Sequence, residues 1–272
     1  MTIARTIAAA RKIVVKIGSA TLAKPDGSIN VPFMEEFAAQ CANMIAAGKQ
    51  IALVSSGAQV AGISTIDRWA RRTDMNYRQA LCAIGQVELM NKWSGAFIRK
   101  GLHTGQLLFT KEDFNDSLRA LCMRNTLFTL VDEGVVPVIN ENDSVACDEI
   151  RIGDNDNLSA LTAVLWNADV LILFSDIDGI YTDNPKTSQN AKLIETVDDI
   201  SALRERITIG SANGFGTGGV STKIEAAEKV CAYGIPMILA NGGCAESLGA
   251  LAESRMRGTL FLATNGRRHE SA

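Results

Sequence analysis

The chain has 272 residues, which suits one large α/β domain or two small ones. A formal net charge of −3 argues against nucleic-acid binding and against a polybasic membrane-binding surface. No apolar run is long enough to span a bilayer, and the first twelve residues have too short an apolar core for a signal peptide. The six scattered cysteines form no Cys-x-x-Cys pair, which suits reduced thiols in a cytoplasmic protein.

Strand and helix patterns alternate along the chain. Apolar, often β-branched runs predict strands at 12–17, 50–55, 107–109, 135–139, 170–174, 235–240 and 258–262. Apolar residues at helical spacing predict helices at 32–47, 77–100, 117–133, from 158 onward, near 199–205, at 222–233 and at 245–256. The alternation predicts an α/β fold with an open, mainly parallel sheet and a soft boundary near Ser175.

Three further segments lack a clear periodic pattern. The first twelve residues are interpreted as a short lead into the first strand. Residues 63–76 are charged and irregular, which suits a flap or a subunit contact. The polar residues 265–272 have no apolar side chain to bury before the final alanine, so we expect this tail to be disordered.

An acidic stretch follows the predicted strand 135–139. Two polar clusters, Asn140 to Asp143 and Gly153 to Asn157, stand where a strand gives way to a helix. Six carboxylates lie within sixteen residues, and Arg151 is the only basic residue among them. A pair of solvated Asp/Asn-rich turns is the ordinary interpretation. The position favours a ligand site, because ligands of open α/β sheets bind beyond the carboxyl ends of the strands.

A glycine-rich loop at 213–219 precedes the predicted helix 222–233. Its Gly-x-Gly-x-x-Gly spacing matches a dinucleotide fingerprint, but no strand leads into it and no acidic residue ends the next strand. We therefore interpret the loop as a phosphate site. Thr222 and Glu225 have capping-box spacing, which would place Lys223 in the first helical turn. An anion bound at that helix end would favour the lysine there.

Lys16 interrupts the first strand two residues before Gly18. A buried, unpaired ammonium is costly, so this side chain either reaches solvent or points into a ligand crevice beside Gly18 and Ser19. Ser56 lacks the Gly-x-Ser-x-Gly context of a nucleophile and better suits holding a substrate carboxylate. Neither a P-loop motif nor the protein-kinase signatures are present, so those two classes are excluded.

The predicted strand 170–174 is followed by Ser-Asp-Ile-Asp-Gly. Asp176 and Asp178 in this segment could be metal ligands, or the loop could close on the ribose or base of a nucleotide. Either interpretation adds a ligand-binding loop at the carboxyl end of another strand.

Five motifs together resemble the amino-acid kinase family and, within it, the kinases that phosphorylate L-glutamate. They are Val15–Ser19, Ser55–Ala58, Asn140–Asp143, Gly153–Ser159 and Gly216–Lys223, in the order found in the family. The resemblance covers residues 12–261 and implies a three-layer α/β/α fold. It implies a substrate-binding lobe at about 12–174 and a nucleotide-binding lobe at about 175–262. Many such kinases continue into a C-terminal RNA-binding-like module, which we expect to be absent here.

The resemblance implies that ATP donates its γ-phosphoryl group to the side-chain carboxylate of L-glutamate, the first step of proline synthesis, with Mg²⁺ bridging phosphate oxygens. Lys16 and Lys223 would stabilise the transferring group, and Asp156 would hold both lysines in place. Glutamate would bind at Ser56, Gly57, Asp143 and Asn155. ATP would bind at Lys16, Gly18, Ser19, Ser175, Asp176, Thr217, Gly218, Gly219, Val220, Ser221, Thr222 and Lys223. No residue is assigned as a protein ligand of a metal ion.

Relatives in this family suggest a cytoplasmic homo-oligomer, a dimer or tetramer, with proline as feedback inhibitor and no nucleic-acid or membrane partner. Two alternatives stay open. The chain could be a kinase of the same family that acts on acetylglutamate, aspartate or a nucleoside monophosphate, or a non-catalytic nucleotide-binding regulator. The acidic stretch disfavours a blocked amine or a phosphate substrate. The joint presence of Lys16, Asp156 and Lys223 disfavours a regulator.

Overall fold

The computed structural model describes residues 1–66, 74–146, 154–185, 187–211 and 219–263. The strands are β1 (Lys12–Ile17), β2 (Gln50–Ser55), β3 (Thr104–Phe109), β4 (Val136–Glu141), β5 (Val170–Ser175), β6 (Thr196–Val197), β7 (Met237–Asn241) and β8 (Thr259–Phe261). The helices are α1 (Ile3–Ala9), α2 (Ser19–Leu22), α3 (Val31–Ala46), α4 (Ala58–Ile66), α5 (Met75–Ile98), the 3₁₀ helix η1 (Lys111–Phe114), α6 (Ser117–Asp132), α7 (Asp154–Trp166), α8 (Ile200–Ser211), α9 (Gly219–Ala232) and α10 (Ser247–Ala252).

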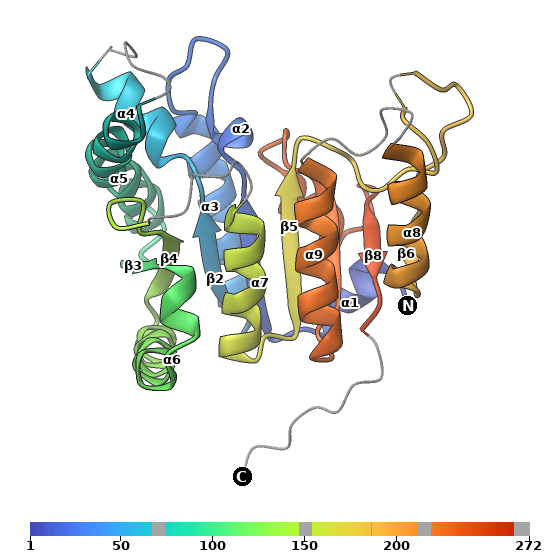
Figure 1. The fold of residues 1–272 in the computed structure, drawn as a ribbon. Helices are drawn as coiled ribbons and strands as arrows, with labels where there is room; N and C mark the ends of the chain where they lie inside the picture. The colour runs from blue at the N-terminus through green and yellow to red at the C-terminus, as the bar shows by residue number, and fades with distance from the viewer. Residues whose placement is uncertain (67–73, 147–153, 186, 212–218, 264–272) are drawn as a thin grey trace.

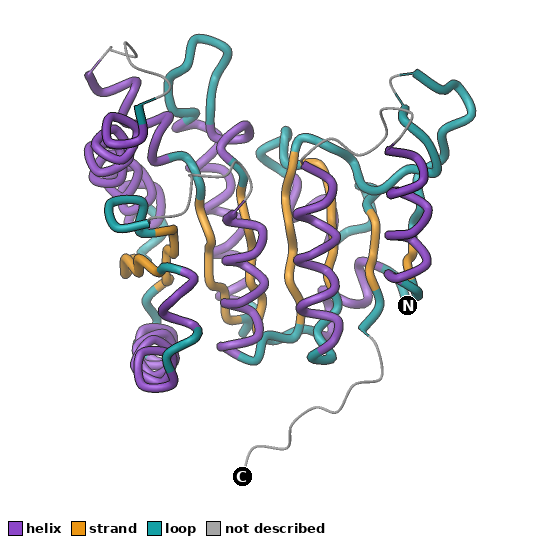
Figure 2. The backbone as a smooth tube through the Cα atoms, in the orientation of Figure 1, coloured by secondary structure: helices purple, strands orange, loops and turns teal. Residues whose placement is uncertain are grey.

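The described strands form one sheet in the order β3-β4-β2-β1-β5-β7-β8-β6 (Figure 1). Every neighbouring pair is parallel except β7 and β8, which run antiparallel. Helices lie in front of and behind this sheet (Figure 2). The prediction of an open, mainly parallel sheet between layers of helices is therefore confirmed. No helix among the described residues is long and apolar enough to cross a membrane.

The alternation of side chains along β1 shows why the central strands are apolar throughout. Ile13 and Val15 pack into the core on the side of α3 and α5, with Phe37. Val14 packs into the core on the side of α7 and α9, with Trp166. Strands covered by helices on both faces need apolar residues at successive positions, which is the pattern from which β1, β2 and β5 were predicted.

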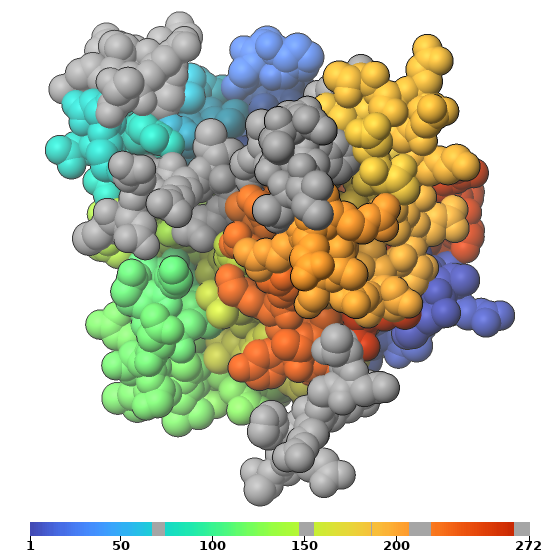
Figure 3. Space-filling view, turned by 45° about the vertical axis from the view of Figure 1, so that its right-hand side comes forward, coloured from blue at the N-terminus to red at the C-terminus, as the bar shows by residue number. Residues whose placement is uncertain are grey.

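Because β1, β2, β4, β5 and β7 are parallel, their carboxyl ends lie at the same edge of the sheet. The loops that follow these ends lie at one end of the molecule. In Figure 3 the segment after β5, drawn in yellow, stands at the same end as α4, drawn in cyan, and the segment before α3, drawn in blue. The polar motifs that come after separate strands are thereby gathered in one region.

Two predicted irregular segments contain helices. The N-terminal lead forms α1, where the Thr2 side chain accepts from the backbone N–H of Arg5 and Ile7 is buried. Residues 58–66 form α4, so the predicted irregular segment 63–76 is helical at its start, and α5 already begins at Met75. The intervening residues 67–73 lie outside the described residues. The prediction of a lead without a helix was wrong, and so was the prediction that residues 63–66 are irregular.

The polar clusters also extend regular elements instead of standing only in loops. Asn140 and Glu141 are the last residues of β4, and residues 154–157 form the first turn of α7. Helix α9 begins at Gly219, three residues earlier than predicted. Thr222 is therefore inside the helix, so the predicted capping box with Glu225 is wrong. Lys223 is in the second turn, not the first.

Candidate active site

Two lysines from different elements meet one carboxylate at the carboxyl edge of the sheet. Lys16 Nζ, from β1, lies 2.6 Å from Asp156 Oδ1, and Lys223 Nζ, from α9, lies 3.2 Å from Asp156 Oδ2. The side chains of Lys16, Lys223 and Asp156 are 7%, 9% and 0% exposed. Asp156 lies in the first turn of α7, where the helix dipole favours a carboxylate. The structure thus brings the three predicted catalytic residues together.

The electrostatics of this cluster leave it with an excess of positive charge. Burial opposes ionisation of Asp156, but Lys16, Lys223 and the Thr222 hydroxyl outweigh it and hold the pKa of Asp156 below its usual value. Burial lowers the pKa of Lys16, and Asp156 offsets only part of that effect. Thr222 Oγ1 donates to Asp156 Oδ2 at 2.9 Å, and Lys223 Nζ donates to the Gly219 carbonyl at 2.8 Å. Two ammonium groups around one carboxylate suit a phosphate ligand.

The predicted ATP-binding residues Gly18 and Ser19 lie directly beside the lysine of β1. A Cβ atom added to Gly18 would lie 3.4 Å from Lys16 Nζ, so glycine leaves the space next to that ammonium open. Ser19 follows as an exposed residue at the start of the four-residue helix α2. Val220 is half-buried and Ser221 is exposed in the first turn of α9, whereas Thr217 and Gly218 lie outside the described residues.

The segment after β5 is fixed by its own aspartates. Ser175 Oγ donates to Asp176 Oδ1 at 2.9 Å. Asp178 accepts from Asn241 Nδ2 at 2.7 Å and from the Tyr181 hydroxyl at 3.0 Å. Asp178 therefore ties the loop to the end of β7. The described residues contain no group of three His, Cys, Asp or Glu side chains that could hold a metal ion.

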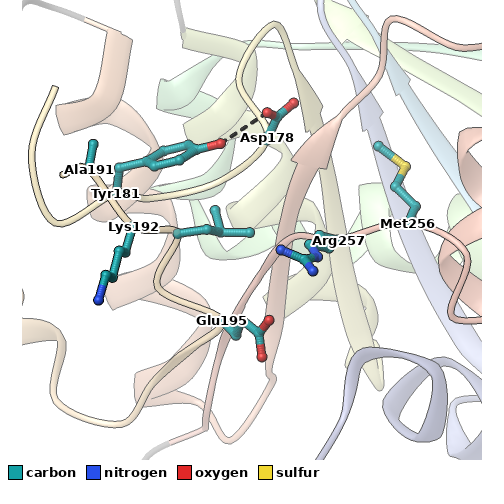
Figure 4. A pocket seen from close by; sticks show the side chains of 8 residues that line it. Asp178, Tyr181, Ala191, Lys192, Glu195, Met256 and Arg257 are labelled. Carbon is teal, nitrogen blue, oxygen red and sulfur yellow. Dashed lines mark hydrogen bonds between the residues drawn. The ribbon is translucent and has the colours of Figure 1, made fainter. Parts of the chain in front are cut away.

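A cavity of about 590 Å³ adjoins this segment. Figure 4 shows Asp178 and Tyr181 on one side of the cavity and Met256 and Arg257 on the other, with Lys192 and Glu195 below. A volume of this size is typical of small-molecule sites. The sequence interpretation included Asp178 but none of the other residues that line this cavity, because they come from two segments far apart in the chain, the one between β5 and β6 and the one between α10 and β8.

The predicted glutamate-binding residues Ser56 and Asn155 are in direct contact. Asn155 Nδ2 donates to Ser56 Oγ at 2.7 Å and to Asn140 Oδ1 at 2.9 Å. Gly57 follows Ser56 with φ of 108°, in the region that favours glycine, and so allows the sharp turn from β2 into α4. Asn140 was not among the predicted binding residues, although it belongs to the acidic stretch.

Asp143 lies against α5, and the structure records no direct bond from it to Ser56 or Asn155. Burial raises the pKa of the Asp143 carboxyl, and contacts with Cys82 and Arg78 oppose this only in part. Burial, together with the nearby Asp143 carboxylate, raises the pKa of the Cys82 thiol to about 12. A half-buried carboxylate with a raised pKa would gain from a cationic ligand, because a nearby positive charge favours its ionised form.

Known proteins resemble this chain in sequence and in structure. The model of the amino acid kinase family matches residues 11–241. The glutamate 5-kinase of Alkaliphilus oremlandii (strain OhILAs) is 55% identical over 92% of this chain and 95% of its own length. The glutamate 5-kinase of Treponema pallidum (strain Nichols) is 45% identical over 94% of this chain and 97% of its own length. The carbamate kinase from Giardia lamblia bound to AMP-PNP has a TM-score of 0.65 and 14% identity, over 93% of this chain and 99% of its own.

The fold, with its buried lysine–aspartate–lysine cluster, therefore accompanies a sequence match that covers most of the chain. The match to the Giardia structure, at 14% identity, concerns the fold alone. The relatives at 45% and 55% identity place the chain within one group of the family, because both are glutamate 5-kinases. The chain belongs to the amino acid kinase family and, within it, to the glutamate 5-kinases.

Proposed function

We propose that this protein transfers the γ-phosphoryl group of ATP to the side-chain carboxylate of L-glutamate, forming L-glutamyl 5-phosphate and ADP in the first step of proline biosynthesis. The observation that carries the proposal is the buried cluster of Lys16, Asp156 and Lys223 at the carboxyl edge of the sheet. Phosphoryl transfer consists mainly of positioning and charge neutralisation, and this cluster is built for both.

The chemistry needs no general base from the protein. The side-chain carboxylate of glutamate is ionised at neutral pH, so one of its oxygens attacks the γ-phosphorus directly. The bond between that phosphorus and the oxygen of the β-phosphate breaks, and the electron pair leaves with ADP. Lys16 and Lys223 stabilise the negative charge on the transferring group and on the leaving oxygen.

Asp156 acts through the two lysines. Each of its carboxylate oxygens contacts one ammonium group, which sets the separation of Lys16 Nζ and Lys223 Nζ before the nucleotide binds. The Thr222 hydroxyl fixes the carboxylate further. Positions set before the reaction cost no reorganisation in the transition state, which is why such preorganised charges are effective.

Glutamate would bind where Ser56, Gly57 and Asn155 meet. The Ser56 hydroxyl suits the α-carboxylate of the substrate, and the Asn155 side chain suits the polar groups on the α-carbon of glutamate. Asp143 would attract the α-ammonium, because a cation restores the ionised form of a carboxyl whose pKa burial has raised. These assignments favour a free amino acid over an N-acetylated one.

ATP would bind on the β5 side of the two lysines. Gly18, Ser19 and the first turn of α9 would contact its phosphates, and Ser175 and Asp176 would contact the nucleoside. The cavity at Tyr181 offers space beyond that segment (Figure 4). Since the described residues offer no carboxylate cage, Mg²⁺ would be held chiefly by phosphate oxygens and water, as is usual for this ion, and would neutralise phosphate charge.

We further propose a cytoplasmic homo-oligomer with two lobes, about 12–174 for glutamate and about 175–262 for ATP. The lobes would share one sheet, because β5 and β7 pair directly across their boundary. Proline, the end product, carries an α-carboxylate and an ammonium like those of glutamate. It would therefore inhibit by competing for the Ser56–Asn155 region.

A coupled ADP-release assay with a panel of substrates tests the proposal. L-glutamate should support ADP release that depends on both ATP and Mg²⁺. Aspartate, N-acetylglutamate and UMP should support little. Hydroxylamine should trap the acyl phosphate as the hydroxamate, which separates phosphorylation of the carboxylate from plain ATP hydrolysis. ADP release that ignores glutamate but responds to one of the other substrates would overturn the proposal.

A further inference from the structure

A chain of amide side chains connects helix α5 to the glutamate end of the proposed site. Asn155 Nδ2 donates to Ser56 Oγ at 2.7 Å and to Asn140 Oδ1 at 2.9 Å. Asn140 Nδ2 in turn donates to Gln86 Oε1 at 2.8 Å. Asn140 is 3% exposed and Gln86 is 9% exposed, so the inner bond is shielded from water. Water cannot easily replace a partner lost from such a chain.

The direction of these bonds decides which atoms are left for a ligand. Both N–H groups of Asn155 are used, so its buried Oδ1, which has no hydrogen-bond partner among the described residues, remains an acceptor. Ser56 Oγ accepts from Asn155, so its own O–H remains available to donate. The pair therefore presents an acceptor for an ammonium and a donor for a carboxylate, the two charged groups common to α-amino acids.

We propose that Gln86 is a positioning residue that sets this direction. As the acceptor at the far end, its Oε1 turns the Asn140 amide so that Asn140 Oδ1 faces Asn155. That in turn keeps the Asn155 oxygen toward the substrate. If Gln86 donated instead, every amide would reverse, and Asn155 would present N–H groups to the substrate ammonium. This inference rests on the proposed glutamate kinase activity and adds a residue that does not itself touch glutamate.

The packing of α5 fixes the backbone position of Gln86, and the buried Nε2 of its side chain has no hydrogen-bond partner among the described residues. A Cβ atom on Gly85 would lie 1.8 Å from a carbonyl oxygen of α4, and one on Gly62 would lie 2.0 Å from a carbonyl oxygen of α5. The two helices therefore touch backbone to backbone next to Gln86. Farther along the same helix, Trp93 Nε1 donates to Ser55 Oγ at 2.8 Å. Helix α5 thus contacts the ends of both β2 and β4, between which the amide chain runs.

Leu and Glu are both close to Gln in size. Replacing Gln86 with each of them therefore distinguishes loss of the hydrogen-bond acceptor from a change in side-chain volume. Gln86→Leu removes the acceptor and should raise the glutamate KM roughly tenfold, equivalent to about 1.4 kcal/mol. The ATP KM and kcat should change much less. Gln86→Glu, assayed at pH 8.5, keeps acceptor oxygens and loses the donor, so its glutamate KM should stay within about threefold of wild type by the same arithmetic. Thr162→Val is the matched control, because Thr162 is a buried hydroxyl of α7 outside the amide chain.

A double-variant comparison tests whether Gln86 acts through Asn140. In the Asn140→Leu background, Gln86→Leu should cause no further rise in the glutamate KM, since the connection is already broken. The inference would be overturned if Gln86→Leu and Gln86→Glu raised the glutamate KM equally. It would also be overturned if the KM increase of the double variant equalled the product of the increases of the two single variants. If the Leu variant does not fold, the Glu variant still decides between acceptor and donor. Wild-type protein without glutamate-dependent ADP release would instead overturn the proposed function itself.

Discussion

The two ends of the proposed site are built from opposite chemistry. At the phosphoryl end, Lys16, Asp156 and Lys223 place three full charges almost out of contact with water. At the glutamate end, Ser56 and Asn155 are held by neutral hydrogen bonds. Charges so deeply buried depend on one another, because removing one leaves the others uncompensated. A neutral amide selects a ligand in a different way, by presenting either its oxygen as an acceptor or its N–H groups as donors.

The difference matches what changes during the reaction. The α-ammonium and α-carboxylate of glutamate keep their charges throughout, so interactions with them act equally on the bound substrate and the transition state. Charge on the transferring phosphoryl group and the leaving oxygen is redistributed as the bond breaks. Variants at the ionic end should therefore lower kcat, whereas variants at the neutral end should raise the glutamate KM.

Asp156→Asn should have the largest effect and would break the ionic end. Lys16 and Lys223 would then be two buried ammonium groups that have lost the carboxylate they share. We expect kcat to fall by at least about three decades and the free energy of unfolding to fall by about 3–5 kcal/mol. Steady-state kinetics and thermal unfolding measure the two effects. Glu253→Gln, which breaks an exposed pair with Arg255, should change neither. A variant with wild-type kcat would contradict the role of Asp156.

Lys223→Ala comes next and tests whether the lysine acts in the transition state. Its kcat should fall by roughly two to three decades, as for loss of one preorganised charge, while the KM values for both substrates move much less. Lys229, on the exposed face of the same helix, provides the control: Lys229→Ala should retain kcat. If Lys223→Ala kept kcat and only weakened ATP binding, the lysine would be an anchor for the nucleotide.

Gly85→Ala probes the scaffold of the neutral end without touching a polar group. The added methyl would meet the backbone of α4, so the helices must separate. We expect a loss of stability of about 3 kcal/mol, at the upper end for overpacking, together with a raised glutamate KM. Gly95→Ala on the same helix has no neighbour within 4 Å and should instead stabilise by about 0.5–1 kcal/mol. Equal changes in melting temperature would contradict the close contact.

The same contact explains what the sequence could and could not predict of the fold. The bounds of β1 and β2 were predicted to the residue, because strands buried on both faces leave continuous apolar runs between polar ends. Helix α4 was missed. Its segment carries Gly62 and four β-branched residues, which favour helix weakly. Gly62 and Gly85 let α4 pack closely on α5. A contact between residues distant in the chain cannot be recognised from the local sequence pattern of α4.

The candidate site divides in a similar way. Family resemblance located Lys16, Asp156 and Lys223, which the structure brings together. Local spacing alone failed at Thr222, which has the spacing of a helix cap but bonds a carboxylate 66 residues away in the chain. Gln86 was missed for a related reason. One glutamine within a long amphipathic helix carries no sign of whether it faces solvent or a buried partner.

Asp143→Asn should have the smallest of these effects on activity and would sharpen the glutamate end. Removing a carboxylate proposed to attract the α-ammonium should raise the glutamate KM roughly tenfold, or about 1.4 kcal/mol, and leave the ATP KM near wild type. The measurement is a glutamate titration at saturating ATP. Ser144→Ala, at the exposed neighbouring position, is the control and should retain the wild-type KM. An unchanged KM in Asp143→Asn would remove Asp143 from the site.

The same variant should be more stable than wild type in the absence of glutamate. Burial raises the pKa of Asp143 above 3.8, so its contribution to stability is fully present below that pH and is lost as pH rises through the folded-state pKa. Asparagine cannot ionise and should not show this loss. Melting temperatures measured from pH 4 upward should therefore diverge, with Asp143→Asn the higher at neutral pH. Saturating glutamate should narrow the gap, because a bound ammonium stabilises only the wild-type carboxylate. A gap independent of both pH and glutamate would show that Asp143 neither titrates in the folded protein nor contacts the substrate.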